Sequence, residues 1–316
     1  MSQFRYIALA LQTRCDAVNR LPDSEVRGAM LAAVERVGVQ IRSARAFIGP
    51  DLRLVVLPEY FMTSYPLGDS IDGWAAKAAI DAGGAEYDAL GKVAEANDIY
   101  LSGNAYETDK HFPGLYFQTS FIIAPTGDVI LRYRRLISMY TPTPHDVWER
   151  YVDIYGIDGV FPVVDTELGR LACCASEEIL FPEVCRAHAL RGAEIILHSS
   201  SEVASPDLTP KDIAKRARAV ENLVYVVSAN TGGLHQSRCI APQHETVPTG
   251  YSRPAHLPAT GPVNFDAIQV LPVLQPGRAF PTRLARIPDR KGAGGVNSGP
   301  AARCQARHHM LAGLPL

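Results

Sequence analysis

Three stretches of this 316-residue chain combine side-chain types that could hydrolyse a small carbonyl or nitrile compound. Leu54–Glu59 is an apolar run that ends in a carboxylate, a candidate general base. Val129–Arg135 follows a Pro-x-Gly turn and ends in cations, which could stabilise a developing oxyanion. Leu171–Ala175 leads into Ser176, whose hydroxyl could attack an electrophilic carbon. Together these stretches predict a hydrolytic site.

The third stretch has the pattern of a buried strand that breaks sharply into a helix. Small apolar residues precede Ser176, two acids follow it, and Phe181–Pro182 opens an amphipathic segment. Such an elbow would hold Ser176 at its tip, where a substrate can reach the side chain. Cys173 and Cys174 lie inside the strand and are interpreted as buried small hydrophobes.

Each stretch also has a purely structural interpretation. Glu59 by itself could be a solvated acid that ends a strand, and the basic run could be a strand edge that discourages pairing with another chain. Two histidines are further candidates. His188 falls on a predicted helix and is interpreted as a surface or interface residue, whereas His198 ends a predicted strand and is a candidate ligand contact.

Short apolar segments alternate with amphipathic ones along the chain, which indicates an α/β protein. The predicted strands are Arg5–Thr13, Leu52–Leu57, Ile99–Tyr106, Thr119–Ala124, Val129–Tyr133, Leu171–Ala175, Ile195–His198 and Val224–Ala229. The predicted helices are Ser24–Gly49, Glu86–Asn97, Pro182–Arg191 and Pro210–Asn222. Thr209, Pro210 and Asp212 supply a cap, a first-turn proline and a first-turn acid, so the last helix is expected to begin at Pro210.

Composition narrows the class of ligand. The net charge is -2, and no basic stripe gathers anywhere, so we expect neither nucleic acid nor an anionic membrane as partner. A small neutral or mildly polar molecule fits better. No metal-ligand spacing occurs and no cofactor is expected. The six irregularly spaced cysteines indicate reduced thiols. The longest apolar run near the N-terminus, Tyr6–Leu11, is far shorter than a signal segment or a membrane span, so we expect a cytoplasmic protein.

The character of the chain changes after Leu234. Residues 1–234 form one predicted domain, whereas residues 235–316 are rich in proline and arginine and lack hydrophobic periodicity. We expect an irregular C-terminal tail. Two explanations stay open, which are a disordered extension specific to this lineage and a shift of reading frame near His235.

Four ordered blocks over roughly residues 4–234 resemble the nitrilase superfamily of carbon-nitrogen hydrolases. They are the Pro-Glu after a strand, the Tyr-Arg basic run, the elbow with Phe-Pro-Glu behind it, and Arg218–Asn222 before a further strand. The resemblance implies an α-β-β-α sandwich that forms a homodimer or a higher homo-oligomer. It also implies hydrolysis of a non-peptide carbon-nitrogen bond in a small amide, carbamoyl or nitrile compound, and amidase chemistry is favoured.

That superfamily works with a Glu base, a Lys that stabilises the oxyanion and a Cys nucleophile. Glu59 matches the base, whereas the Lys and Cys positions hold Arg135 and Ser176. Arginine keeps the positive charge but does not readily give up a proton. A serine hydroxyl needs a strong, aligned base to attack, whereas a thiol ionises near neutral pH. A catalytically inactive protein that binds a small molecule or acts as a scaffold is therefore the alternative.

Substrate contacts are expected on the loops around this site, Thr63–Trp74, Met139–Tyr155 and Ser199–Asp207. The candidates for binding the substrate are Tyr65, Tyr140, Glu178, His198 and Glu202.

Overall fold

The computed structural model describes residues 4–66, 69–138, 141–202, 208–236 and 285–288. The tail predicted at 235–316 lies outside these ranges, except for residues 235–236 and 285–288. The last of these segments forms strand β12, Ala285–Pro288, which pairs antiparallel with β1, Phe4–Ala10.

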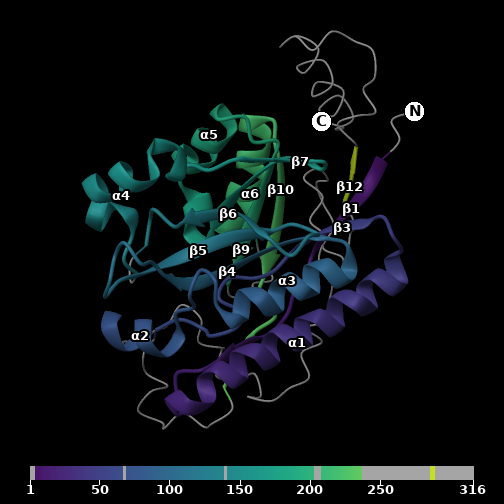
Figure 1. Ribbon diagram of the computed structural model, residues 1–316. Helices are drawn as coiled ribbons and strands as arrows, with labels where there is room; N and C mark the ends of the chain where they lie inside the picture. Colours follow the sequence, from purple (N-terminus) through teal and green to yellow (C-terminus); the bar gives the residue numbers. More distant parts are fainter. Residues whose placement is uncertain (1–3, 67–68, 139–140, 203–207, 237–284, 289–316) are drawn as a thin grey trace.

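Two principal sheets lie face to face in the centre of the molecule, with a small strand pair beside them (Figure 1). The larger sheet has the order β12-β1-β3-β4-β5-β6, and its remaining strands are Leu52–Val56, Tyr100–Thr108, Tyr116–Ile123 and Val129–Arg134. The smaller sheet has the order β10-β9-β8-β7, with strands Tyr225–Asn230, Ile195–Ser200, Gly169–Ala175 and Val164–Thr166. The separate pair is β11 with β2, Leu234–Gln236 with Cys15–Ala17.

Helices cover the outer face of each principal sheet, which gives the predicted α-β-β-α sandwich (Figure 1). On the side of the larger sheet lie α1, Asp23–Ile48, α2, Ile71–Ala78, and α3, Ala85–Asn97. On the side of the smaller sheet lie α5, Pro182–Leu190, and α6, Pro210–Asn222, with α4, Trp148–Tyr155, at one end. Three short 3-10 turns complete these elements, Pro144–Val147, Ile157–Gly159 and Ser176–Leu180.

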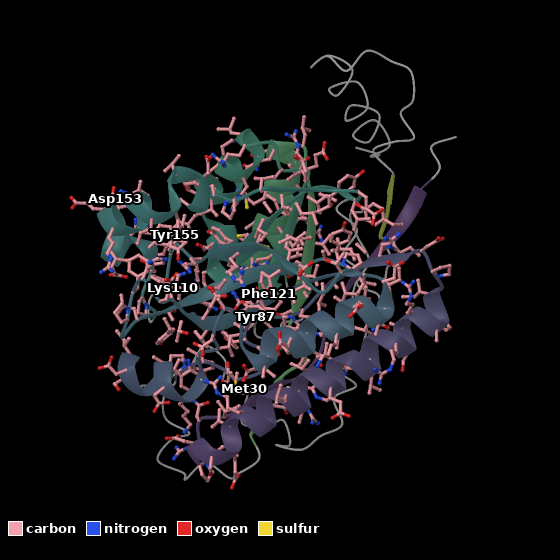
Figure 2. The ribbon with its side chains drawn as sticks, in the orientation of Figure 1. Met30, Tyr87, Lys110, Phe121, Asp153 and Tyr155 are labelled. Atoms are coloured by element: carbon pink, nitrogen blue, oxygen red, sulfur yellow. The ribbon has the colours of Figure 1, made fainter. Side chains whose placement is uncertain are left out.

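Alternation of side chains along the strands builds a core on both faces of the larger sheet. Ile7 and Leu9 of β1 face the cluster under α1 and α3, whereas Tyr6 and Ala8 face the cluster between the sheets. This is the period of two expected for a strand that is buried on both sides. Figure 2 shows Tyr87 of α3 beside Phe121 of β5, with ring centroids 5.2 Å apart in an edge-to-face arrangement.

All eight predicted strands and all four predicted helices are present, with ends that differ by a few residues. The start of α6 is confirmed, because the Asp212 backbone N–H donates to the Thr209 hydroxyl at 3.2 Å and helix residues begin at Pro210. The segment expected as a loop over Met139–Tyr155 contains α4 instead. Its apolar residues Trp148, Tyr151, Val152 and Tyr155 recur at helical spacing, but eight residues are fewer than the window over which periodicity identifies a helix. Among the helices that the structure describes, none has the length and apolar content to cross a membrane.

Candidate active site

The candidate base Glu59 lies just beyond the carboxyl end of β3, against the carboxyl end of β9 in the other sheet. The Glu59 backbone N–H donates to the Ser200 carbonyl at 3.3 Å, which joins the two strand ends. Ligands of α/β proteins commonly bind at such carboxyl ends. Only 1% of the Glu59 surface is exposed, so its carboxylate must find its partners inside the protein.

Three side chains hold this carboxylate. Glu59 Oε1 accepts from Gln118 Nε2 at 2.6 Å and from Arg135 Nη1 at 3.1 Å. Its other oxygen, Oε2, accepts from the Ser201 hydroxyl at 2.5 Å, and that hydroxyl also lies 2.6 Å from the Tyr60 hydroxyl. Because donors reach both oxygens, the carboxylate is fixed in orientation.

Arg135 follows the last residue of β6, and its guanidinium fork reaches four groups. Its Nη1 donates to Glu59 and, at 2.7 Å, to Gln118 Oε1, while its Nη2 donates to Glu177 Oε2 at 2.6 Å. The Nε atom donates to the Ile137 carbonyl at 2.7 Å. Burial opposes the charged form, but the carboxylates of Glu59, Glu178 and Glu177 outweigh it and raise the pKa of Arg135 above its ordinary value. Arg135 is thus a fixed cation.

Ser176 lies at the predicted elbow, directly after β8 and at the start of a 3-10 turn. Its φ of 50° is left-handed, which costs a non-glycine residue about 1–2 kcal/mol. Surrounding contacts hold this backbone in place: the Ser176 carbonyl accepts from His198 Nε2 at 2.9 Å. The side chain is fully buried, and its hydroxyl donates to Glu177 Oε2 at 2.7 Å.

His198 supports the elbow as a neutral ring. A carbonyl oxygen can only accept, so the proton of the ring lies on Nε2, and Nδ1 accepts from the Ser228 hydroxyl at 2.8 Å. Burial, helped by the positive charge of Lys215, lowers the pKa of His198 to about 3. The contacts of His198 in the structure are therefore with the protein's own elbow and the neighbouring strand β10.

Glu178 lies under the elbow and joins it to the segment that carries Arg135. Its Oε1 accepts from the Tyr133 hydroxyl at 2.8 Å and from the backbone N–H groups of Leu136 and Ile137 at 2.7 and 3.2 Å. Its Oε2 accepts from the Ala175 N–H at 3.1 Å. The residue is fully buried, and burial raises the pKa of its carboxyl group. Glu178 thus connects two of the three candidate catalytic positions.

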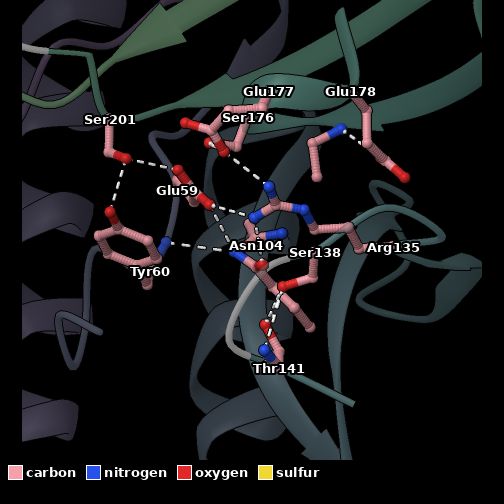
Figure 3. Close-up of polar contacts among 12 residues, drawn as sticks. Glu59, Tyr60, Asn104, Arg135, Ser138, Thr141, Ser176, Glu177, Glu178 and Ser201 are labelled. Carbon is pink, nitrogen blue, oxygen red and sulfur yellow. Dashed lines mark hydrogen bonds and ion pairs between the residues drawn. The ribbon is translucent and has the colours of Figure 1, made fainter. Parts of the chain in front are cut away.

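Glu177, which the sequence did not single out as a site residue, points to the centre of the site. Figure 3 shows its carboxylate beside both Ser176 and Arg135. Its Oε1 accepts from Lys211 Nζ of α6 at 2.8 Å. Burial opposes the charge, but Lys211 and Arg135 outweigh it and hold the pKa of Glu177 well below its usual range.

The other predicted substrate contacts have different partners in the structure or lie outside the described residues. Glu202 pairs with Lys215 of α6 at 3.3 Å, and its backbone N–H and carbonyl both bond to the side chain of Asn230. Tyr65 packs against the Tyr60 ring with centroids 5.8 Å apart. Tyr140 lies outside the described residues.

Several polar residues of the site were not identified from the sequence. Gln118 lies within β5, where the antiparallel register with β6 places its carbonyl 2.9 Å from the Arg135 N–H. Its amide also donates to Asn104 of β4 at 3.1 Å. Polar residues inside otherwise apolar strands were the available signal, because a buried amide needs partners. Within the described ranges, no group of three or more His, Cys, Asp or Glu side chains could hold a metal ion.

Comparison with known proteins agrees with this architecture. A formamidase of Bacillus thuringiensis (strain Al Hakam) is 27% identical over 218 residues, which cover 67% of this chain and 60% of that protein. A formamidase of Bacillus cereus (strain AH820) matches with the same values. The chain therefore spans about 60% of the length of the curated relatives that it matches.

Solved structures share the fold. Nit3 of Saccharomyces cerevisiae, a member of branch 10 of the nitrilase superfamily, has a TM-score of 0.55 at 22% identity over 72% of this chain and 75% of that one. A mutant of the Nesterenkonia AN1 amidase has a TM-score of 0.54 at 20% identity, covering 73% and 79% of the two chains. The carbon-nitrogen hydrolase family pattern matches residues 27–253, well over half of the sequence. The chain belongs to the carbon-nitrogen hydrolase family.

Proposed function

We propose that this protein hydrolyses the carbon-nitrogen bond of a small amide, with Ser176, Arg135 and Glu59 as its catalytic residues. The observation that carries the proposal is the buried hydrogen-bonded chain from Glu59 through Arg135 to the elbow (Figure 3). It brings together a carboxylate, a permanent cation and a hydroxyl from three distant parts of the sequence. These are the groups that acyl transfer requires.

In the proposed reaction, the Ser176 oxygen bonds to the amide carbon, and its proton passes to the Glu59 carboxylate. The carbonyl oxygen becomes an oxyanion, which Arg135 stabilises by charge. The carbon-nitrogen bond then breaks, and the leaving amine takes the proton from Glu59. Water attacks the resulting ester, gives its proton to Glu59, and releases the acid while the proton returns to Ser176. Lys211 and Arg135 stabilise the charged form of Glu177, which makes Glu177 a poor proton acceptor.

The relatives support a small amide as the substrate. The matching Bacillus proteins are formamidases, and a double mutant of the Nesterenkonia amidase was solved in complex with acrylamide. Carbamoyl compounds and nitriles offer a similarly small electrophilic carbon and belong in the same assay.

A second candidate function is binding of a small molecule without turnover. It is favoured by the contact between the Ser176 hydroxyl and Glu177, whose low pKa makes it a poor acceptor for the serine proton. A serine nucleophile normally depends on an aligned histidine. His198 of β9 contacts Ser176, but its Nε2 is directed to the Ser176 carbonyl instead of the hydroxyl.

The test is release of ammonia from a panel of formamide, acetamide, propionamide, a carbamoyl compound and a nitrile. Turnover by the unmodified chain that disappears in Ser176→Ala supports the hydrolase. Mass spectrometry can detect an acyl adduct at residue 176, and Ser176→Ala is the matched control. This variant retains every cysteine, so an adduct on a cysteine persists in it, whereas an adduct on Ser176 is lost. Inactivity of both the unmodified chain and a folded Ser176→Cys variant would refute the hydrolase proposal and favour the binding protein.

We further propose a homodimer or a higher homo-oligomer in the cytoplasm. Large apolar side chains are exposed on and beside α5 and α6, which supports burial against a second copy. They are Phe181, Leu190, Ile213 and Val220. The free cysteines at 15, 173, 174 and 185 suit a reducing compartment. Light scattering during size exclusion tests the first point, because a monomeric mass at micromolar concentration would contradict it.

A further inference from the structure

One carboxylate connects the candidate nucleophile to two cations. Glu177 Oε2 accepts from both the Ser176 hydroxyl, at 2.7 Å, and Arg135 Nη2, at 2.6 Å. Its Oε1 accepts from Lys211 Nζ at 2.8 Å. We propose that Glu177 is a positioning residue that closes Ser176, Arg135 and Lys211 into one cluster and withholds their donors from a substrate. The proposal rests on the proposed function in one respect, that residue 176 faces the substrate.

The cluster draws on three parts of the fold. Ser176 and Glu177 come from the elbow after β8, Arg135 comes from the end of β6, and Lys211 comes from the first turn of α6. Lys211 is only 8% exposed, although lysine is seldom buried without a partner. A buried lysine aimed at Glu177 indicates that the carboxylate is held in this position from both sides.

Solvent meets the cluster at Glu177. Its side chain is 33% exposed, whereas those of Arg135 and Lys211 are 9% and 10% exposed and Ser176 is fully buried. The adjacent acid Glu178 differs, because its donors are the Tyr133 hydroxyl and backbone N–H groups. Glu178 therefore braces the elbow, whereas Glu177 lies between the solvent and the groups that would act on a substrate.

This arrangement has a chemical consequence for any nucleophile at position 176. A carboxylate in direct contact with the nucleophilic atom disfavours a negative charge on that atom. It also occupies Arg135 Nη2, a donor that an oxyanion could otherwise use. Neutralising Glu177 should leave Lys211 without this carboxylate partner, and Arg135 paired with Glu59 alone, beside residue 176. The positive charge beside residue 176 then favours ionisation of that residue, whereas the Glu177 carboxylate opposed it.

The test measures ionisation at position 176 directly and needs no turnover. In a Ser176→Cys background, the rate of alkylation by iodoacetamide is followed against pH, and mass spectrometry locates the product at residue 176. The unmodified serine chain, with the same buried cysteines, gives the background rate. Adding Glu177→Gln is expected to lower the midpoint of this pH profile by about one unit or more, which is about tenfold more thiolate at neutral pH.

Two further variants make the result specific. Glu183 is an exposed acid on α5, so adding Glu183→Gln changes the net charge equally and should leave the midpoint within about 0.3 unit. Adding Lys211→Met should raise the midpoint, because it removes a cation and leaves Glu177 in place. This second direction keeps the proposal testable if Glu177→Gln fails to fold.

The proposal is overturned if the midpoint is unchanged or rises in Glu177→Gln, or if it is unchanged or falls in Lys211→Met. These outcomes are separate from those of the amide assay. A shifted midpoint with no amide turnover supports the role of Glu177 while the hydrolase proposal fails. Turnover with an unshifted midpoint supports the hydrolase while the role of Glu177 fails.

Discussion

Glu178→Ala offers a sharp test of how the candidate site is held together. The substitution removes the acceptor of four donors, the Tyr133 hydroxyl and the backbone N–H groups of Leu136, Ile137 and Ala175. Each buried donor left without a partner costs about 1–3 kcal/mol. Loss of a buried carboxylate and entry of water offset part of this total. We therefore expect the free energy of unfolding to fall by about 3–5 kcal/mol.

Glu178→Gln separates the shape of the side chain from its charge. The amide oxygen can replace Oε1 and serve Tyr133, Leu136 and Ile137, but the amide nitrogen then faces the Ala175 N–H, which is also a donor. A smaller loss of about 1–2 kcal/mol is expected. Urea unfolding followed by circular dichroism measures both losses. Glu183→Ala, at an exposed acid on α5, is the control and should stay within about 0.5 kcal/mol of the unmodified chain.

One pattern of results would refute this reasoning. If Glu178→Ala unfolds within about 0.5 kcal/mol of the unmodified chain, the carboxylate does not brace the elbow. A normal unfolding free energy combined with weaker binding of an amide would instead support the direct substrate contact that was expected from the sequence. Loss of both would indicate that binding depends on the brace.

Three other perturbations have defined outcomes. The pKa of His198 is about 3, so the unfolded chain binds one more proton between pH 6.5 and 3, and stability falls as pH falls through this window by about 1.4 kcal/mol per unit. Free energies of unfolding from urea titrations between pH 5.5 and 4 should have a slope against pH that is smaller by about this amount in His198→Gln. An unchanged slope contradicts the assignment. Arg135→Met leaves Glu59 and Glu177 without their shared cation and should lower the unfolding free energy by about 3–5 kcal/mol, measured by the same method. Arg135→Lys should lose less, and equal losses would argue against a charge effect. Gln118→Leu removes a donor to Glu59 and an acceptor of Arg135, so a loss of about 1–3 kcal/mol is expected in thermal unfolding; a neutral result would show that these contacts are dispensable.

The order of strands and helices followed from the sequence because it depends on local periodicity. Apolar residues at every second or every third to fourth position give a segment its type wherever it lies in the fold. The elbow was predicted in the same way, and the left-handed backbone of Ser176 between β8 and a 3-10 turn agrees with that prediction. The helix at Trp148–Tyr155 was missed because its amphipathic pattern lasts only eight residues.

The sequence by itself determined the fold class and marked Glu59, Arg135 and Ser176 as the positions of interest. Only the tertiary structure decided how these side chains are partnered. Lys211 reaches Glu177 across 34 positions, and Ser201 reaches Glu59 across 142. Such pairs depend on the register of strands and the placement of α6 against the elbow, which no local pattern records. Glu177 and Glu178 are adjacent in sequence, yet one meets the cations of the site and the other meets backbone donors, because successive residues of the turn point in different directions.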